Sequence, residues 1–306
     1  MGKIAFLFSG QGAQKPGMGK DFYDNSEAAK ALFKAADEYR AGTSAQCFEG
    51  TAEELKETVN TQPCLYLTDL SGALMLEENG IHADGAAGFS LGEIAALAFG
   101  GAYSYADGFK IVCARGIFMD EAANSSDSMM AALMLLDEEK VKALCEKVPQ
   151  VYPANFNTEK QIVVSLAKGS FDDLSKAAKE ARGRAMRLAV SGGFHSPFMD
   201  PAAEKFAAEL EKYEIGETKI PVYSNFTSKP YEKEIRFNLS KQINNPVLWQ
   251  KSIENMAADG FDTFIEIGIG DTLQKMVQKI LPNARTFKVS TYEDMLKMKE
   301  ELGDNA

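Results

Sequence analysis

The chain alternates short apolar runs with longer segments whose apolar residues have helical spacing. Residues 3–8 and 261–267 are mainly apolar, so both are expected to be buried strands. Helical spacing extends over residues 26–39, 64–76 and 105–123. Strands and helices that alternate in this way predict an α/β fold built on a parallel sheet.

The order of the expected strands and helices changes after a polar segment at residues 124–128. From there the expected order is strand, helix, strand, strand, helix, strand, which is the order of a ferredoxin-like unit. The expected ranges of these elements are 129–136, 137–147, 151–155, 162–167, 171–181 and 184–190. We therefore expect a large α/β-hydrolase-like domain formed by residues 1–127 and 191–306, with a small ferredoxin-like α+β subdomain, residues 128–190, inserted into it.

The segment Gly88-Phe89-Ser90-Leu91-Gly92 has the Gly-x-Ser-x-Gly form of a nucleophile elbow. Small residues precede it and good helix formers follow it, so a strand, a sharp turn and a helix are expected in succession. Such a turn exposes the Ser90 hydroxyl at the start of a helix, where free backbone N–H groups favour negative charge. A glycine-rich connection without a catalytic role has the same pattern, so the motif by itself leaves both interpretations open.

A second glycine-rich segment, Ser9–Gln14, follows the first expected strand. Its Gly10-x-Gly12 resembles the start of a dinucleotide-binding loop, but Lys15 stands where the third glycine is needed, which disfavours that interpretation. A glycine loop at the carboxyl end of a strand is still where an open α/β sheet forms its site. The backbone N–H groups of this loop could therefore face an oxyanion.

The chain contains only two histidines, which narrows the choice of a general base. His195 lies in the glycine-rich loop Ser191–Met199, where the chain is expected to re-enter the large domain. A loop histidine at a domain junction is a better candidate base than His82, which we expect to be a surface or packing residue. A structural role for His195 fits the same position, because the pattern specifies no geometry.

Arg115 is the only charged residue in an apolar stretch, residues 111–119, of an expected buried helix. A buried guanidinium without an anionic partner is strongly destabilising. Its partner is either a structural carboxylate, such as that of Glu93, or the carboxylate of a substrate, which the arginine fork binds through two hydrogen bonds. The residues alone leave these two alternatives open.

Composition excludes several classes of function. The net charge of -11 leaves no excess of cations for binding nucleic acid. No apolar stretch is long enough to cross a bilayer, and the N-terminal run is too short for a signal peptide, so we expect a cytoplasmic protein without a membrane partner. Two histidines cannot form a multi-histidine zinc site, so no metal is expected. Four scattered cysteines are expected to be small buried residues in a reducing compartment: Cys47, Cys64, Cys113 and Cys145.

Taken together, these motifs resemble those of the malonyl-CoA:acyl-carrier-protein transacylases of fatty-acid synthesis and the acyltransferase domains of polyketide synthases. Their order and spacing agree over roughly residues 3–285. The matching segments are Phe8–Gln14, Gly88–Glu93, Arg115–Met119, Asn155–Asn157 with Gln161–Val164, Phe194–Ser196, Asn245–Val247 and Gly268–Gly270.

The resemblance implies a catalytic machinery. Ser90 would be the nucleophile that carries the malonyl group as an ester, and His195 would be its base and later the acid that protonates the leaving thiol. The backbone N–H groups of Gln11 and Leu91 would form the oxyanion hole. No cofactor is implied, because the coenzyme A thioester is a substrate.

The resemblance also implies residues that bind the substrate or orient the base. Arg115 would pair with the free carboxylate of the malonyl group, which favours a substrate over a structural carboxylate as its partner. Asn155, in the Asn-x-Asn segment, would be a substrate-binding residue. A backbone carbonyl near Asn245–Val247, that of Leu248 or a neighbour, would orient His195 in place of a carboxylate.

The chain departs from the family pattern at four positions. Phe89 stands where histidine is common, Leu248 where glutamine or arginine is often found, and Ile269 where proline is common. Ser9 replaces a frequent proline, and little consequence is expected. None of these changes removes the nucleophile, the base or the arginine. Phe194, before the loop histidine, resembles malonyl-selective rather than methylmalonyl-selective domains.

The expected function is transfer of a malonyl group from malonyl-CoA, through a Ser90 ester, to the phosphopantetheine thiol of acyl carrier protein. The alternatives are a serine esterase, an acyltransferase of a polyketide or malonate-decarboxylase system, and a scaffold subunit without activity. An esterase is disfavoured, because that class normally has an acid between the serine and a late histidine. We expect the protein to be a monomer.

Carrier proteins are usually acidic, and so is this chain, so docking would need a local basic patch. The small subdomain contains several cations that could form one, although a solvated charged face has the same pattern. The candidates are Lys168, Lys176, Lys179, Arg182, Arg184 and Arg187.

Overall fold

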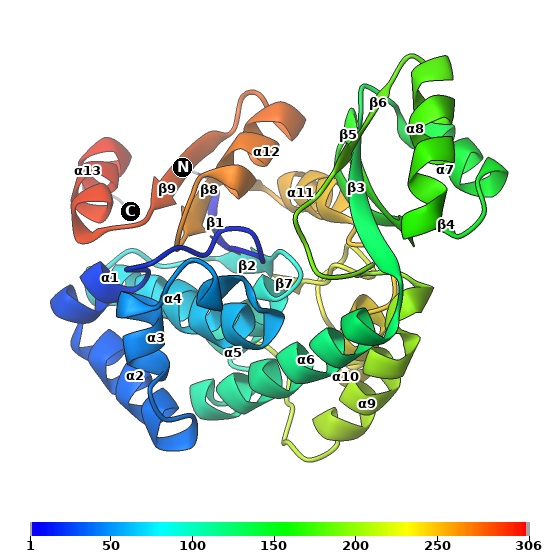
Figure 1. The fold of residues 1–306 in the computed structure, drawn as a ribbon. Helices are drawn as coiled ribbons and strands as arrows, with labels where there is room; N and C mark the ends of the chain where they lie inside the picture. The colour runs from blue at the N-terminus through cyan, green and yellow to red at the C-terminus, as the bar shows by residue number, and fades with distance from the viewer. Residues whose placement is uncertain (1, 304–306) are drawn as a thin grey trace.

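The computed structural model describes residues 2–303, which form two sheets with helices packed around them (Figure 1). The ends of the predicted domain ranges, Met1 and residues 304–306, lie outside the described residues. One sheet has the strand order β7-β2-β1-β8-β9 and the other the order β4-β5-β3-β6. The expected α/β fold with a parallel sheet is confirmed, and the second sheet is antiparallel.

All strand pairs of the five-stranded sheet are parallel. Its strands are β1 (Lys3–Phe8), β2 (Gly85–Gly88), β7 (Val222–Tyr223), β8 (Phe261–Ile267) and β9 (Arg285–Val289). Phe8 pairs with Gly88 in register, so the chain leaves β1 and β2 at the same edge of the sheet. The two glycine-rich motifs that follow these strands therefore begin side by side.

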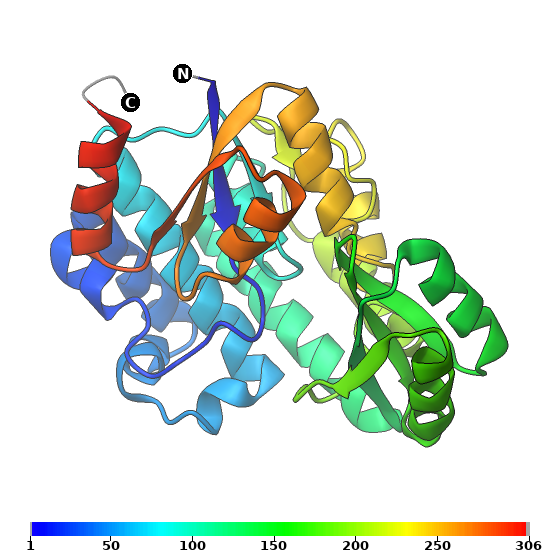
Figure 2. The ribbon, with the colours of Figure 1, turned by 90° about the horizontal axis from the view of Figure 1, so that it is seen from above.

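Helices cover this sheet on both faces (Figures 1 and 2). The helices that precede the small subdomain are α1 (Lys20–Asn25), α2 (Glu27–Tyr39), α3 (Thr43–Glu49), the 3-10 turn η1 (Glu54–Lys56), α4 (Thr58–Glu78), α5 (Gly92–Phe99) and α6 (Tyr105–Ser125). Those that follow it are η3 (Pro197–Met199), α9 (Asp200–Leu210), α10 (Ile235–Gln242), α11 (Trp249–Ala258), α12 (Thr272–Ile280) and α13 (Tyr292–Leu302). None of the described helices is both long and apolar enough to cross a membrane.

The alternation of side chains along β1 explains why its whole run is apolar. Phe6 and Phe8 belong to the core that includes α4 and α5, whereas Ala5 and Leu7 belong to the core that includes α11 and α12. A strand with helices on both faces needs apolar residues at every position. The continuous apolar run is therefore a consequence of the two layers of helices.

Helix α4 begins earlier than its apolar pattern predicts. It starts at Thr58 and includes Pro63, whereas the prediction placed the start of the helical run at Cys64. A proline this close to the N-terminus of a helix removes a single intrahelical hydrogen bond. Several residues of the first turns are polar although they are buried like the rest of α4. The pattern of apolar residues therefore does not extend to the start of the helix.

The small subdomain has the predicted order of elements. These are β3 (Ser128–Met134), α7 (Glu138–Lys147), β4 (Val151–Thr158), β5 (Gln161–Ala167) followed by the turn η2 (Lys168–Ser170), α8 (Phe171–Glu180) and β6 (Arg184–Arg187). Met129, Ala131 and Leu133 of β3 pack in one core with α7 and α8. The predicted end of the last strand at residue 190 is wrong, because the chain leaves the sheet after Arg187 to reach the junction between the two sheets.

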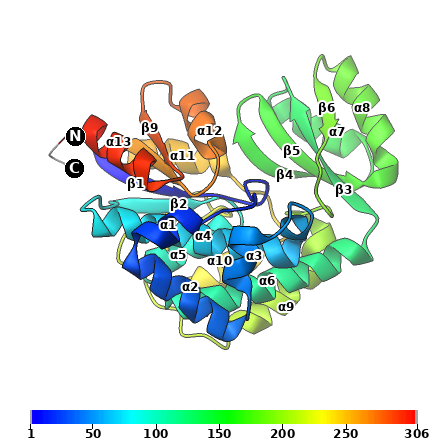
Figure 3. The ribbon, with the colours of Figure 1, turned by 60° about the vertical axis from the view of Figure 1, so that its left-hand side comes forward.

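A direct backbone contact joins the small sheet to the loop before α11, and Figure 3 shows the small sheet beside the large one, at the end of α6. Phe156 of β4 donates its N–H to the carbonyl of Val247 (2.9 Å), and Val247 donates to the carbonyl of Ala154 (2.9 Å). On the other face of β3, Met130 and Ala132 pack into the large core. The pocket described below lies at this junction.

Candidate active site

The predicted strand, turn and helix at the Gly-x-Ser-x-Gly motif are present as β2, a turn and α5. Ser90 has a φ of 55°, in the left-handed region that non-glycine residues rarely adopt. A Cβ on Gly88 would lie 2.0 Å from the carbonyl carbon of Gly92, and a Cβ on Gly92 would lie 2.3 Å from the carbonyl oxygen of Phe8. Both glycines are therefore needed for the turn to pack against its own helix and against β1.

Asn225, just after β7, secures the turn from the other side. Its Oδ1 accepts a hydrogen bond from the backbone N–H of Ser90 (2.7 Å), and its Nδ2 donates to the carbonyl of Gly88 (2.7 Å). These contacts stabilise the strained backbone of Ser90. No motif along the chain pointed to Asn225. The signal available was its place after the strand that neighbours β2, because such positions meet at one edge of a parallel sheet.

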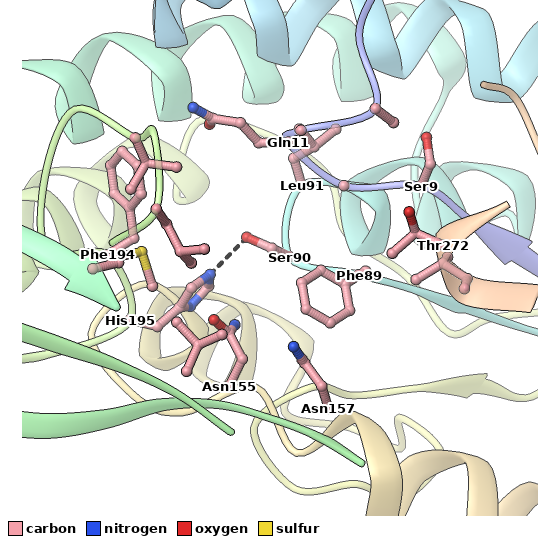
Figure 4. Close-up of a pocket in the computed structure, with 18 of the residues that line it drawn as sticks. Ser9, Gln11, Phe89, Ser90, Leu91, Asn155, Asn157, Phe194, His195 and Thr272 are labelled. Carbon is pink, nitrogen blue, oxygen red and sulfur yellow. Dashed lines mark hydrogen bonds between the residues drawn. The ribbon is translucent and has the colours of Figure 1, made fainter. Parts of the chain in front are cut away.

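The structure brings Ser90 and His195 together although 105 residues separate them, with Ser90 Oγ 2.7 Å from His195 Nε2 (Figure 4). His195 Nδ1 lies 2.8 Å from the backbone carbonyl of Gln242. Because a carbonyl can only accept, Nδ1 carries the proton and Nε2 of the neutral ring is free to accept one. Ser90 Oγ–H therefore donates to His195 Nε2, which is the arrangement for general-base activation of a serine.

The expectation that Leu248 supplies the orienting carbonyl is wrong. The Leu248 carbonyl accepts hydrogen bonds from the backbone N–H (2.9 Å) and the hydroxyl (3.0 Å) of Ser252 in α11. Gln242 is the last residue of α10, where carbonyls have no intrahelical partner and remain available. His195 also donates its backbone N–H to the carbonyl of Ile243 (3.1 Å), so the histidine loop is bound to the end of this helix.

The environment of His195 keeps its ring neutral. Burial, together with the positive charge of Arg115, lowers the pKa of His195 to about 4, and the carbonyls of Gln242 and Asn245 oppose this shift only in part. Since the base is active when unprotonated, we expect Ser90 acylation to stay nearly constant from pH 7 to 5.5 and to fall to half near pH 4. Rapid-quench mass spectrometry of acyl-enzyme formation across this range would measure it. An inflection near 6.5 would contradict the buried, neutral histidine.

Gln11 and Leu91 lie on the side of Ser90 opposite His195 (Figure 4) and line the same pocket. Within residues 2–303, neither backbone N–H donates a hydrogen bond to the protein. Leu91 directly precedes α5, so its N–H is one of the unpaired donors at a helix start. Both N–H groups are therefore available for an oxyanion, as the resemblance implies.

Ser9 anchors the Gln11 loop, so its replacement of a frequent proline has a consequence that was not expected. Ser9 Oγ donates to Oδ1 of Asp69 in α4 (2.8 Å), and both residues are buried. Burial raises the pKa of Asp69 well above its usual range. A Cβ on Gly10 would lie 2.6 Å from the carbonyl oxygen of Phe89, so this loop packs directly against the elbow.

Arg115 of α6 is fully buried and reaches the Ser90 hydroxyl. Its Nη1 donates to Oε1 of Gln62 (2.8 Å), and its Nη2 donates to Oε1 of Gln242 (2.7 Å) and to Ser90 Oγ (3.1 Å). Burial lowers the pKa of Arg115 to about 10, and the charge of Glu93 opposes this shift, so the guanidinium stays charged at neutral pH.

No carboxylate in residues 2–303 forms an ion pair with Arg115 within 4.0 Å, and Nε of Arg115 has no hydrogen-bond partner there. The neighbours that hold the guanidinium are neutral amides, and Glu93 is linked to it only through Gln242. The expected structural partner is thus not in direct contact. A buried charge without a protein counter-ion can bind an anionic group of a ligand.

These residues line a pocket of about 260 Å³ at the junction of the two sheets. Asn155 and Asn157 of β4 enter it from the small sheet, and Oδ1 of Asn157 is buried without a hydrogen-bond partner among the described residues. Phe89 also lines it and packs edge-on against Trp249, with ring centroids 5.4 Å apart, so here it serves as an apolar wall. His82 lies outside the pocket, exposed and bonded to Glu77.

The fold and the pocket define an α/β enzyme whose site pairs a serine hydroxyl with a neutral histidine beside a buried cation. The model of the acyl transferase domain family matches residues 5–306, and the chain belongs to this family.

Individual relatives agree with this membership. The malonyl CoA-acyl carrier protein transacylase of Bacillus subtilis (strain 168) is 41% identical to this chain over 317 residues, covering 100% of both. The crystal structure of the malonyl CoA-acyl carrier protein transacylase from Clostridium perfringens ATCC 13124 superposes with a TM-score of 0.95 at 37% identity, covering 98% of this chain and 97% of the other. A malonyl-transacylase in complex with its type II polyketide acyl-carrier protein superposes with a TM-score of 0.93 at 31% identity, covering 98% and 99%.

Proposed function

We propose that this chain transfers a malonyl group from malonyl-CoA, through an ester on Ser90, to the phosphopantetheine thiol of acyl carrier protein. One observation carries the proposal. Arg115 is buried and charged beside Ser90 Oγ, and no carboxylate of residues 2–303 pairs with it. An acyl group with a carboxylate of its own is the ligand that such a cation selects. The names of the relatives agree with this substrate and this partner.

In the first half-reaction, His195 Nε2 takes the proton of Ser90 Oγ as this oxygen attacks the thioester carbonyl carbon. The backbone N–H groups of Gln11 and Leu91 stabilise the resulting oxyanion. The intermediate collapses by breaking the carbon–sulfur bond, and the imidazolium returns its proton to the leaving coenzyme A thiolate. Arg115 holds the far carboxylate throughout, so the malonyl group stays in place as the ester.

In the second half-reaction, the carrier-protein thiol enters the space that coenzyme A has left. His195 takes the thiol proton as the sulfur attacks the ester carbonyl, and the same N–H groups stabilise the oxyanion. The carbon–oxygen bond to Ser90 breaks, and the imidazolium protonates Ser90 Oγ. The two half-reactions are chemically symmetric, which is the ping-pong pattern of covalent catalysis.

The esterase alternative is less well supported by the site. His195 Nδ1 is oriented by the neutral carbonyl of Gln242 rather than by a carboxylate, and a buried cation suits an anionic acyl group better than a neutral lipid. Acyl transfer in a polyketide or malonate-decarboxylase system uses the same chemistry, so the site does not separate these systems from fatty-acid synthesis. A scaffold subunit without activity does not need the hydrogen bond between Ser90 and His195.

We also propose the finer description of the fold. Within the predicted ranges 1–127 and 191–306, the described residues form an α/β-hydrolase-like domain, supported by the parallel sheet with its serine turn between β2 and α5. Residues 128–190 form a ferredoxin-like subdomain, supported by the antiparallel strand order and by the two helices that share one core on its sheet.

The proposed reaction needs no cofactor, because every group that it uses is a side chain or a backbone N–H. A monomer suffices for the same reason, since the serine, the histidine and the arginine belong to one chain. The free thiols of all four cysteines agree with a reducing compartment such as the cytoplasm.

The basic residues proposed for carrier-protein docking are already engaged in part. Lys168 forms an ion pair with Asp127 (2.9 Å), and the guanidinium of Arg187 lies 4.1 Å from the ring centroid of Phe171. Exposed ion pairs of this kind contribute little and can exchange partners at small cost. The group therefore remains a candidate docking surface for an acidic carrier protein.

Intact-protein mass spectrometry after brief mixing with malonyl-CoA or acetyl-CoA tests the proposed function. We expect a malonyl adduct on the peptide that contains Ser90, poor labelling by acetyl-CoA, and movement of the label to holo-acyl carrier protein when it is added. If neither donor labels the protein while a simple ester is hydrolysed, or if water removes the label faster than the carrier protein does, the esterase is the better assignment.

A further inference from the structure

Gln242 contacts three residues of the candidate active site, His195, Ser90 and Arg115. Its backbone carbonyl accepts from His195, its Nε2 donates to the carbonyl oxygen of Ser90 (2.6 Å), and its Oε1 accepts from Arg115 Nη2 (2.7 Å). The side chain is fully buried. A single residue thus links His195, through its backbone, with Ser90 and Arg115, through its side-chain amide.

The second hydrogen of this amide goes to Glu93, a buried glutamate in the first turn of α5. Gln242 Nε2 donates to Oε2 of Glu93 (2.7 Å). The other carboxylate oxygen, Oε1, accepts from the backbone N–H of Asn225 (3.0 Å) and from the hydroxyl of Tyr231 (2.5 Å). No ion pair within 4.0 Å involves Glu93 in residues 2–303, so hydrogen bonds alone hold this buried carboxyl group.

These contacts fix which way the Gln242 amide points. Both hydrogens of Nε2 face acceptors, the Ser90 carbonyl and the Glu93 carboxylate, so Oε1 must face Arg115. In the reversed amide, Oε1 would face those two acceptors and Nε2 would face the donors of the guanidinium. Both faces would then be mismatched in a buried site, where unmet hydrogen bonds are costly.

We propose that Glu93 is a positioning residue which, through the side chain of Gln242, holds Arg115 in the orientation that recognises the carboxylate of the acyl group and thereby sets the preference for malonyl over acetyl donors. The inference rests on the proposed function, because it assigns a role within the same Ser90 ester and Arg115 contact. The side chain of Glu93 contacts neither Ser90 Oγ nor His195. Its contact with the backbone N–H of Asn225 supports the Ser90 turn, which both donors use alike, whereas its effect on Arg115 passes through Gln242.

The role does not depend on the ionisation state of Glu93. Burial raises the pKa of Glu93 to about 7, although its hydrogen bonds to Tyr231, Gln242 and Asn225 oppose the shift. A proton on Oε1 can be donated to the hydroxyl of Tyr231, which then acts as the acceptor. Oε2 still accepts from Gln242 in that state. The charged or ionisable groups that face Glu93 from other elements are Tyr231, Tyr103 and Arg115.

The test is a double-mutant cycle read out as donor preference. Glu93→Met keeps the length of the side chain and removes both acceptors, and Gln242→Met removes the amide but keeps the carbonyl that orients His195. For each variant, kcat/KM of Ser90 acylation is measured with malonyl-CoA and with acetyl-CoA. We expect Glu93→Met to lower the malonyl-to-acetyl ratio about tenfold, mainly through malonyl-CoA. The variant that carries both Glu93→Met and Gln242→Met should show the same malonyl-to-acetyl ratio as Gln242→Met alone, because Glu93 acts on Arg115 through Gln242.

Tyr231→Phe is the matched control, because it removes a hydrogen bond to the same carboxyl group on the side away from Gln242. It should lower the melting temperature, as Glu93→Met does, while keeping the wild-type donor ratio. The inference fails if Glu93→Met lowers acylation by both donors equally, or if its effect on the ratio adds fully to that of Gln242→Met. If Glu93→Met does not fold, a wild-type ratio in Gln242→Met overturns the inference.

Failure of the proposed function gives a different result. In that case the wild-type protein forms no malonyl ester, and there is no donor preference for Glu93 to set. If the wild type forms the ester and prefers malonyl-CoA while the Glu93→Met ratio is unchanged, only the role of Glu93 is lost.

Discussion

Replacing Ser90 with alanine should abolish the covalent malonyl adduct and lower transfer from malonyl-CoA to acyl carrier protein by at least about 10⁴-fold. The substitution removes Oγ, which is the only atom of the residue that bonds to His195 and Arg115. The fold should persist, because Asn225 binds the backbone N–H of Ser90 rather than its side chain. Intact-mass measurement after mixing with malonyl-CoA, together with a carrier-protein transfer assay, checks both parts of this prediction.

Ser191→Ala is a suitable control for this experiment. It removes an exposed serine hydroxyl from the loop that leads to His195, at a position whose contact is with Thr58 rather than with the nucleophile. This variant should be labelled as the wild type is. Adduct formation on the Ser90→Ala protein would show that another residue is the nucleophile.

Replacing Arg115 with alanine should reverse the preference between malonyl-CoA and acetyl-CoA. Breaking a buried charge pair costs about 3–5 kcal/mol, which corresponds to a loss on the order of 10²–10⁴-fold in kcat/KM for the malonyl donor. Acetyl-CoA has no carboxylate to lose a partner, and the vacated, uncharged space suits its methyl group. Acylation rates with the two donors, measured on the same preparation, give the ratio.

Arg115→Lys separates the charge of this residue from its shape. A lysine keeps a positive charge but cannot bridge Gln62 and Gln242 with two nitrogens of one planar group, as Arg115 does. We expect a malonyl preference that is weaker than in the wild type and not reversed. An equal fall for both donors in Arg115→Ala would assign Arg115 a purely structural role.

The residues that we propose to react could be located from the sequence because each carries a local signature. In the Gly-x-Ser-x-Gly turn, Gly88 allows a close contact with Gly92, within a few residues of Ser90. Gly92 in turn allows close packing against the neighbouring strand β1. His195 was found by elimination, since the chain has only two histidines. Arg115 was found because a charge in an apolar stretch of helix is costly. All three signatures lie in the local sequence and do not depend on the tertiary structure.

The residues that support this machinery have no such signature. Gln242 acts on His195 through its backbone carbonyl, and any residue type provides a carbonyl, so the sequence pointed instead to Leu248. Asn225 matters because it follows the strand beside β2, which is decided by the strand order. Glu93 follows the elbow and was considered only as a direct partner of Arg115, whereas the intervening amide comes from a distant helix.

The amino-acid sequence by itself determined the alternation of strands and helices, the insertion of an antiparallel unit and the identity of the serine, the histidine and the arginine. These features follow from local periodicity and from the cost of placing particular residues in particular surroundings. Only the tertiary structure decided which carbonyl orients the histidine, which amides hold the arginine and that no carboxylate of residues 2–303 neutralises it. Those outcomes depend on contacts between segments 47 to 127 residues apart, and local sequence does not encode such distances.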